Sequence, residues 1–343
     1  MNHLIKKILG GIELKSKKLK VLSLLVGVML ICSLIAGCGE QQASQSSENE
    51  QQKAEEPIKI GVIVKALNSD FWKTVEAGAK AAGKDLGVEV EVLGPSAETA
   101  VSEQINMIED QITKGVSALA VAPSQPASAI PVFDQAKAAG IPVVLIDTDA
   151  PWDDKVSFVG TGNYNGGKQA GEFIAEKLGK GGKVVILRGA VGDPTHDERS
   201  NGAIEVLREK GLEILDIQPA NSERGLGMTV MENILQVHPD VQAVFATNDE
   251  MALGALRALQ AANKKIIVVG FDGSPDALKS IENGELTATV AQNSFNIGYQ
   301  GVVAAVKAAK GEPVDKRIDT GTKIISKDNV KEEMEKLQEI LGQ

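Results

Sequence analysis

Short runs of Val, Ile and Leu alternate with segments of helical periodicity from Pro57 almost to the end of the chain, and no other feature restricts the fold as much. The runs are apolar throughout rather than at every second position. That pattern is typical of strands in parallel sheets that helices cover on both faces. We predict strands at residues 58–64, 88–93, 117–121, 142–146, 156–159, 183–188, 212–217, 241–245, 266–270 and 287–291. Helices are predicted between most of them, at residues 71–86, 99–113, 126–139, 163–178, 197–210, 223–236, 248–262 and 294–309.

The number of strand–helix units decides between one domain and two. About ten units exceed one open sheet of ordinary width. A length of 343 residues also suits two domains. We therefore expect an α/β fold with two doubly wound, Rossmann-like lobes. A single β/α barrel is the alternative, because it alternates strand and helix as well.

The N-terminal 56 residues have a different composition. Six lysines precede an uncharged, mostly apolar run at 21–36, which is the right length for the apolar part of a signal peptide. The run ends Ile35-Ala36-Gly37-Cys38, which resembles the lipobox of bacterial lipoproteins. We predict a signal peptide at 1–37, lipidation of Cys38, and a flexible tether at 38–56 that is rich in Gln, Ser and Glu. An uncleaved anchor helix is the alternative.

Charge and cysteine content exclude several functions. The chain carries a formal net charge of −10, and without residues 1–37 it has 30 basic and 45 acidic residues, or −15. So acidic a body argues against nucleic-acid binding, which depends on Lys and Arg. The whole chain has only two cysteines, both near the N-terminus, and only three histidines. We therefore expect no disulfide framework, no metal centre and no cofactor.

Polar side chains follow many of the predicted strands. In an open parallel sheet such groups converge on one crevice at the carboxyl ends of the strands. Asp, Asn, Arg and Gln pair with vicinal hydroxyls, and the adjacent Phe71 and Trp72 suit the C–H face of a sugar ring. These polar and aromatic residues also have purely structural interpretations. Asn248 could cap a helix, the Phe71–Trp72 pair could pack in the core, and Arg199 could be a solvated helix residue.

Three motifs suggest enzymes, and each departs from its pattern. Residues 160–166 resemble a dinucleotide fingerprint, but the last glycine comes one residue late. Residues 162–169 resemble a P-loop, but Gln169 replaces the hydroxyl residue that holds Mg²⁺. His196-Asp197-Glu198 lacks a second histidine, and no nucleophile–base pair stands out. We predict no catalytic residues.

Three segments carry a resemblance to a known family, namely 239–256, 268–273 and 288–292. With the lipobox, they identify residues from about 58 to about 330 as similar to the type I periplasmic sugar-binding proteins of ABC importers, in the ribose- and allose-binding branch. The resemblance implies a monomer with two lobes joined by three crossings, near Thr161-Gly162, Gln292-Asn293 and Gly321-Thr322. The N-terminal lobe would comprise 57–161 plus 293–321, and the C-terminal lobe 162–292 plus 322–343.

The resemblance also implies a function and a site. The protein would stand on the outer face of a membrane, bind a monosaccharide or polyol between its lobes and deliver it to an ABC permease. The implied ligand-binding residues are Lys65, Ser69, Phe71, Trp72, Asp147, Thr148, Arg199, Asn201, Ser222, Asn248, Asp272 and Gln292.

Four positions depart from the pattern of ribose binders and put ribose itself in doubt, namely Ser69, Ala122, Thr148 and Ser222. Trp152 is a candidate to replace the aromatic residue lost at Ser222, with loop packing as the alternative.

Other functions remain as alternatives to transport. A transcriptional regulator with the same effector fold would need an N-terminal helix-turn-helix, where this chain has a signal-like segment. A chemoreceptor-linked or signal-molecule sensor would use the same binding chemistry. An enzyme is disfavoured by the lack of a nucleophile–base pair.

Overall fold

The computed structural model describes residues 57–341, so the predicted signal peptide, Cys38 and the tether lie outside the described residues. Its strands are β1 (Lys59–Ile63), β2 (Glu89–Leu93), β3 (Ala118–Val121), β4 (Val143–Ile146), β5 (Phe158–Gly160), β6 (Lys183–Arg188), β7 (Glu213–Pro219), β8 (Ala243–Ala246), β9 (Ile267–Asp272), β10 (Ala288–Gln292), β11 (Arg317–Asp319) and β12 (Thr322–Ser326). Its helices are α2 (Asp70–Leu86), α3 (Val101–Lys114), α4 (Pro126–Ala138), α5 (Asn163–Leu178), α6 (Pro194–Glu209), α7 (Arg224–Val237), α8 (Asp249–Ala261), α9 (Pro275–Glu282), α10 (Ser294–Ala309) and α11 (Val330–Leu341). None of these helices combines the length and the apolar character that crossing a membrane requires.

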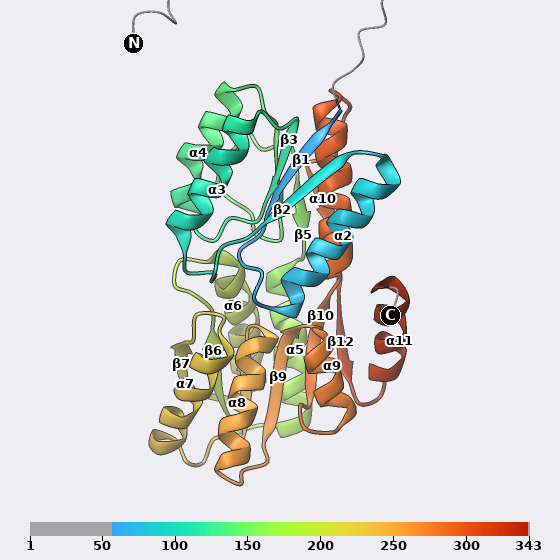
Figure 1. Cartoon of the computed structure of the whole chain (residues 1–343). Coiled ribbons are helices and arrows are strands. Elements are labelled where there is room, and N and C mark those ends of the chain that lie inside the picture. The colour runs from blue at the N-terminus through green and yellow to red at the C-terminus, as the bar shows by residue number, and fades with distance from the viewer. Residues whose placement is uncertain (1–56, 342–343) are drawn as a thin grey trace, which may run out of the picture. The chain divides into compact units, whose positions relative to one another are not determined.

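The strands form two open six-stranded sheets, with the orders β11-β5-β4-β3-β1-β2 and β12-β10-β9-β8-β6-β7 (Figure 1). We call the part built on the first sheet the N-terminal lobe and the part built on the second the C-terminal lobe. All strand pairs are parallel except β10 with β12. The prediction of two doubly wound lobes is confirmed, and the barrel alternative is excluded because neither sheet closes.

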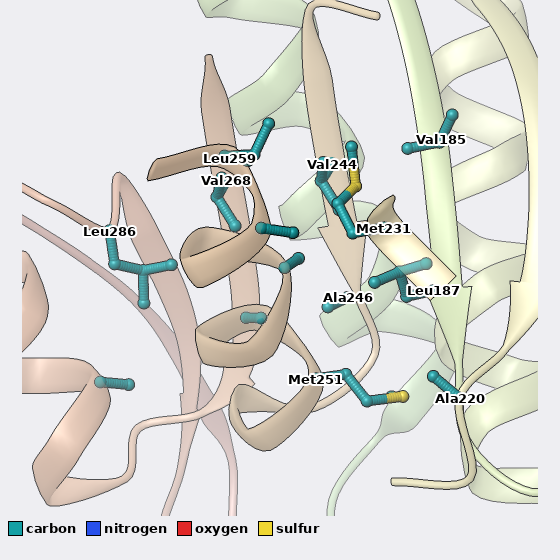
Figure 2. Close-up of a cluster of buried hydrophobic side chains, with 14 of the residues drawn as sticks. Val185, Leu187, Ala220, Met231, Val244, Ala246, Met251, Leu259, Val268 and Leu286 are labelled. Carbon is teal, nitrogen blue, oxygen red and sulfur yellow. The ribbon is translucent and has the colours of Figure 1, made fainter. Parts of the chain in front are cut away.

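Each sheet has a hydrophobic core on both faces. In the N-terminal lobe, α2 and α10 cover one face, and α3 and α4 cover the other. In the C-terminal lobe, α5 and α6 cover one face. Figure 2 shows the core on the opposite face, where Met231 of α7 lies beside Val244, Leu259 of α8 lies beside Val268, and Met251 of α8 belongs to the same cluster near Ala220. Covering on both faces explains why the strands are apolar throughout.

The chain passes between the two sheets three times. It leaves β5 of the first sheet for α5, which packs on the second sheet. It leaves β10 of the second sheet for α10, which packs against α2 in the N-terminal lobe. The third passage joins β11 to β12. These last two strands, together with α9 and α11, are absent from the sequence-based prediction, because they are short or half-exposed and lack continuous apolar runs.

Pairs of glycines let helices cross closely in both lobes. A Cβ on Gly298 of α10 would lie 1.9 Å from the carbonyl oxygen of Val75 in α2. A Cβ on Gly167 of α5 would lie 2.1 Å from the carbonyl oxygen of Arg199 in α6. Gly167 belongs to the segment that resembles a P-loop, so its structural role is helix packing.

Candidate functional site

Two adjoining cavities lie where the carboxyl ends of both sheets face each other between the lobes. The first cavity is lined by Lys65, Phe71, Trp72, Glu98, Asp147, Thr195, His196, Arg199, Asn248 and Asp272. The second is lined by Asn68, Ser69, Phe71, Trp72, Glu98, Asn221, Ser222, Glu223, Asn248 and Asp272. Both lobes contribute to each, so the post-strand residues converge as parallel strands require.

The aromatic pair comes from the first turn of α2. The rings of Phe71 and Trp72 meet edge to face with centroids 4.9 Å apart. Both are buried in the N-terminal core and also line both cavities. Trp72 Nε1 donates a hydrogen bond to Glu98 Oε1 at 2.8 Å, which fixes the indole. Core packing and ligand contact are therefore compatible at these positions.

Asp147, directly after β4, presents an unused acceptor. Its backbone has φ 59°, a left-handed conformation that few non-glycine residues adopt. Thr148 Oγ1 donates to Oδ2 at 2.9 Å, and Lys65 Nζ lies 3.7 Å from the same oxygen. Oδ1 is buried with no hydrogen-bond partner among the described residues. A buried carboxylate oxygen without a donor is costly unless a ligand supplies one.

Arg199 of α6 is held rigidly on the C-terminal lobe. Its guanidinium stacks 3.9 Å from the centroid of Phe271, Nε donates to Asn163 Oδ1 at 2.9 Å, and Nη1 donates to the carbonyl of Thr247 at 2.9 Å. Only 3% of its surface is exposed, so the interpretation as a solvated helix residue is wrong.

Asp272 is the partner of Arg199 at the end of β9. Burial raises its pKa well above the ordinary value, although the Arg199 charge 3.5 Å away opposes that rise. Gln292 Nε2 donates to Asp272 Oδ1 at 2.8 Å, and Gln292 accepts from Thr161 Oγ1 at 2.6 Å. Thr161 and Gln292 lie at two of the passages between lobes, so the site connects directly to the hinge.

The lobes touch across the cleft through polar contacts. Lys65 Nζ of the N-terminal lobe lies 2.6 Å from Asp193 Oδ2 of the C-terminal lobe, and the hydroxyls of Thr148 and Thr195 lie 3.0 Å apart. Burial disfavours the charged form of Asp193, but the Lys65 charge, the nearby His196 and the hydrogen bonds from Lys65 and the Thr195 amide together outweigh burial and lower the pKa of Asp193 to about 2. This pair therefore stays ionised near neutral pH.

A serine–histidine pair, which the sequence did not reveal, lies at the cavity wall. His196 Nε2 is 3.0 Å from Ser222 Oγ, and His196 Nδ1 is 2.8 Å from Thr247 Oγ1. Burial lowers the pKa of His196 to about 3, so the ring is neutral and a weak base. Its second nitrogen faces a hydroxyl rather than a carboxylate, so the pair lacks the third member of a triad.

Glu98, Asp193 and His196 approach one another within the 4.8 Å span of a possible metal site. The Lys65 ammonium, however, already lies 2.6 Å from the Asp193 carboxylate. A cation would have to displace Lys65 from a buried ion pair, so this set fits a metal poorly.

Several predicted residues take other positions. Asn201 was predicted to bind the ligand, but it is exposed and outside both cavities. It follows Arg199 by two residues, which turns it about 200° around α6 at 3.6 residues per turn. Thr148 and Gln292 are buried behind Asp147 and Asp272 rather than on the cavity surface. Ser69 and Ser222 line the second cavity.

Asn248 and Trp152 resolve two open alternatives. Asn248 caps α8, accepting from Met251 N at 3.0 Å, and it also lines both cavities. Trp152 packs on Phe133 with centroids 5.4 Å apart and donates to Asp134 at 2.8 Å. It belongs to the N-terminal core rather than to the cleft, so the loop-packing alternative is correct.

Several residues line the cavities without having been predicted from the sequence, namely Asn68, Glu98, Thr195, His196, Asn221 and Glu223. Glu98 follows β2, so the rule that selected other post-strand residues could have found it. His196 belongs to the same helical face as Arg199, three residues away.

Comparisons with known proteins agree with this geometry. Residues 60–313 match the family model described as "Periplasmic binding protein domain". The chain is 41% identical over 265 residues to the ribose import binding protein of Bacillus subtilis (strain 168), covering 77% of this chain and 86% of that protein. It is 34% identical over 269 residues to the D-allose-binding periplasmic protein of Escherichia coli (strain K12), covering 74% and 86%.

A solved structure gives the same result. The carbohydrate transporter solute-binding protein of Agrobacterium radiobacter in complex with D-arabinose superposes with a TM-score of 0.79 at 30% identity. The match covers 83% of this chain and 99% of that one.

Proposed function

This chain belongs to the type I periplasmic sugar-binding proteins, in the ribose- and allose-binding branch, and from that premise we propose that it binds a monosaccharide or related polyol in the cleft between its lobes. As a member of this family it is extracytoplasmic. The observation that carries the proposal is the buried Asp147 Oδ1, which has no hydrogen-bond partner within residues 57–341 and belongs to a cavity that also holds the guanidinium of Arg199.

The arrangement of donors and acceptors suits neighbouring hydroxyls. Asp147 accepts, Arg199 donates, and Lys65 provides a further cationic donor in the same cavity. Phe71 and Trp72 supply an apolar wall for the C–H face of the ring. A neutral polyhydroxylated ring therefore matches this cavity better than an anion or an apolar molecule.

Binding from both lobes explains how a ligand would control closure. Phe71, Trp72 and Asp147 belong to the N-terminal lobe, and Arg199 and Asp272 belong to the C-terminal lobe. A ligand that bridges both favours the closed state by its differential affinity for that state. Two consecutive hydrogen bonds, Thr161 to Gln292 and Gln292 to Asp272, connect the hinge to the site and would couple its movement to Asp272.

The closed protein would then dock, as a monomer, on an ABC permease and deliver the sugar.

Anchoring through lipidated Cys38 fits this role, because it keeps the protein near the permease. In a Cys38→Ala variant we expect an unprocessed precursor or release from membranes. Normal processing and membrane retention of that variant would contradict the anchor.

The relatives in this branch are binding proteins of transport systems, and this chain would likewise make and break no bonds. The neutral His196 beside Ser222 supports that absence of catalysis. A role in sensing a sugar or a sugar-like signal is the second candidate, because the same cleft would serve it.

Titration calorimetry with pentoses, hexoses and polyols tests the proposal. We expect at least one of them to release or absorb heat with saturable binding. If none binds, while a nucleotide or an amino acid does, the proposal is wrong.

A further inference from the structure

One buried ion pair joins the two lobes across the cleft. Lys65 follows β1 in the N-terminal lobe, and its Nζ lies 2.6 Å from Oδ2 of Asp193, which precedes α6 in the C-terminal lobe. Both side chains are 2% exposed. Within residues 57–341, no other Lys or Arg lies within 4.0 Å of a carboxylate of the opposite lobe. In this part of the chain, the attraction between full opposite charges therefore joins the lobes at this pair alone.

Asp193 acts behind the cavities rather than in them. It is absent from the lining of both cavities, whereas Lys65 lines the first. Its Oδ1 accepts a hydrogen bond from Thr195 N at 2.9 Å and caps α6, so only Oδ2 is directed to the opposite lobe. His196 Nε2 lies 3.8 Å from Oδ2, but that ring is neutral. The charge of Asp193 therefore reaches the site through Lys65.

Lys65 lies between two carboxylates that belong to different lobes. Asp147 of its own lobe is 3.7 Å away, and Asp193 of the opposite lobe is 2.6 Å away. Burial would lower the pKa of Lys65, but the charges of Asp193, Asp147 and Glu98 raise it, so the ammonium keeps its charge. Because Coulomb attraction falls with distance, Lys65 pairs mainly with Asp193 when the lobes are together. With the lobes apart, Asp147 would be its nearest partner.

We propose that Asp193 is a positioning residue that acts when the lobes close: it replaces Asp147 as the partner of Lys65 and stabilises the closed cleft without touching the sugar. Asp147 is then available to accept from a sugar hydroxyl. A contact that exists only in the closed state favours that state and slows the release of what the cleft encloses. This inference rests on the proposed function, because it concerns how the same cleft retains a sugar.

Asp193→Asn tests the proposal with little change in shape. Asparagine still caps α6, but its neutral amide does not balance the charge of Lys65. The probes are D-ribose, D-arabinose, D-xylose, D-allose, D-galactose and myo-inositol, and each one that binds in calorimetry is used. For each, we expect the dissociation rate to rise at least tenfold and the association rate to stay within about threefold. Stopped-flow tryptophan fluorescence measures both rates, because Trp72 lines both cavities.

Three further measurements distinguish a positioning role from a sugar contact or from a purely structural role. The affinity ratio between any two probes should change by less than about twofold, because Asp193 does not touch them. The melting temperature without sugar should change little, because the helix cap is kept. In a Lys65→Met background, Asp193→Asn should weaken binding no further, because its effect passes through Lys65.

Asp240→Asn is the matched control. Asp240 pairs with Lys183, but this pair is exposed, lies within the C-terminal lobe and is outside both cavities. The control should leave both rates unchanged. It removes an aspartate–lysine pair as Asp193→Asn does, without removing one between lobes.

The outcomes separate this inference from the proposed function. If no pentose, hexose or polyol binds the unaltered protein, the proposed function is wrong and the role of Asp193 in retaining a sugar is wrong with it. If sugars bind and Asp193→Asn releases them no faster, sugar binding stands and the inference is wrong. Unequal effects on the probes, or an undiminished effect in the Lys65→Met background, would also overturn it, because Asp193 would then act without Lys65.

Discussion

The two lobes share one strand order, yet they satisfy their polar groups differently. Asp147 follows β4 and Asp272 ends β9, at equivalent places in the two sheets, and both have positive φ. Asp272 has partners within its own lobe or hinge, Arg199 and Gln292. Asp147 keeps one oxygen that accepts no hydrogen bond from any residue in the described part of the chain. The polar groups of the C-terminal half of the site therefore have protein partners, whereas Asp147 in the N-terminal half has an oxygen available to accept a hydrogen bond from a ligand.

A second contrast lies in the polar groups that organise the strand ends. In the N-terminal lobe a neutral amide does this: Gln104 donates to the carbonyls of Val64 and Ala122 and accepts from Ser124 N. In the C-terminal lobe a buried carboxylate does it: Asp249 accepts from Ser274 N and Thr289 Oγ1. Only the carboxylate can titrate, so the two lobes should respond differently to pH.

Removing Arg199 should have the largest effect, because it damages both the site and its lobe. Arg199→Ala leaves Asp272 buried without its cation and exposes the ring of Phe271. We expect sugar affinity to fall by about 100-fold or more and the melting temperature to drop, since removing one partner of a buried pair is strongly destabilising. Arg208 is an exposed arginine on the same helix, so Arg208→Ala is the control. It should change neither the sugar affinity measured by calorimetry nor the melting temperature.

Asp147→Asn should weaken binding without weakening the fold. The amide loses the charge that accepts from a sugar hydroxyl, and asparagine tolerates positive φ. We expect about a tenfold or greater loss of affinity, since hydrogen bonds to charged groups contribute ~1.5–3 kcal/mol. The melting temperature should change little, because Oδ1 has no partner to lose among the described residues and Lys65 keeps its closer ion pair with Asp193. Asp153→Asn, at an exposed position, is the control; a large loss of stability in Asp147→Asn alone would contradict the contrast between the lobes.

Alanine at the packing glycines should distinguish the lobes as well. Gly298→Ala places its Cβ against the Val75 carbonyl, and Gly167→Ala places its Cβ against the Arg199 carbonyl. Both should lower the free energy of unfolding by ~1–3 kcal/mol through overpacking. Only Gly167→Ala should also reduce sugar affinity, because it moves Arg199.

Gly225→Ala is the control for these two variants. It adds a Cβ to α7 with nothing within 4 Å, so unfolding by urea should show no loss of stability. Equal affinities for Gly167→Ala and Gly298→Ala would contradict the positioning role of Gly167.

Asp249→Asn should change the pH dependence of stability. Burial raises the pKa of Asp249 from 3.8 to about 7, so the folded state holds a proton that the unfolded state releases between these values. The stabilisation is fully present below pH 4 and is lost as the pH rises through 7. Each pH unit in that window changes the free energy of unfolding by up to about 1.4 kcal/mol per proton.

Urea unfolding at several pH values between 4 and 8 measures this effect. Asp249→Asn should flatten the slope, whereas Gln104→Ala in the N-terminal lobe should lower stability equally at every pH. An unchanged slope in Asp249→Asn would show that another group is responsible.

The smallest effect is expected at the segment that resembles a P-loop. Lys168 pairs with Glu205 at 2.7 Å on the surface, away from the cleft. Lys168→Ala should leave sugar affinity within about twofold, since exposed substitutions away from a site matter little. If Lys168→Ala lost sugar binding while Asp147→Asn kept its sugar affinity, the location of the site would be contradicted.

The sequence predicted most strands and helices correctly, because burial on both faces leaves a continuous apolar run. It also selected Lys65, Asp147, Arg199 and Asp272, because residues after parallel strands share one sheet edge. It failed at β11 and β12, whose half-exposed residues carry little pattern. It placed Asn201 in the site, because a linear motif does not show which side of a helix a residue faces.

By itself, then, the sequence determined the two-lobed architecture and the set of strand ends that form the cleft, because both follow from local periodicity and the direction of parallel strands. Only the tertiary structure decided which groups meet across the cleft. Lys65 and Asp193 are separated by 128 positions in sequence, and their 2.6 Å contact depends on how the lobes close about the hinge. Among the described residues, one oxygen of Asp147 has no partner, and Glu98 lines both cavities of the cleft. No periodicity encodes such contacts, because each depends on how residues far apart in the sequence pack against one another across two lobes.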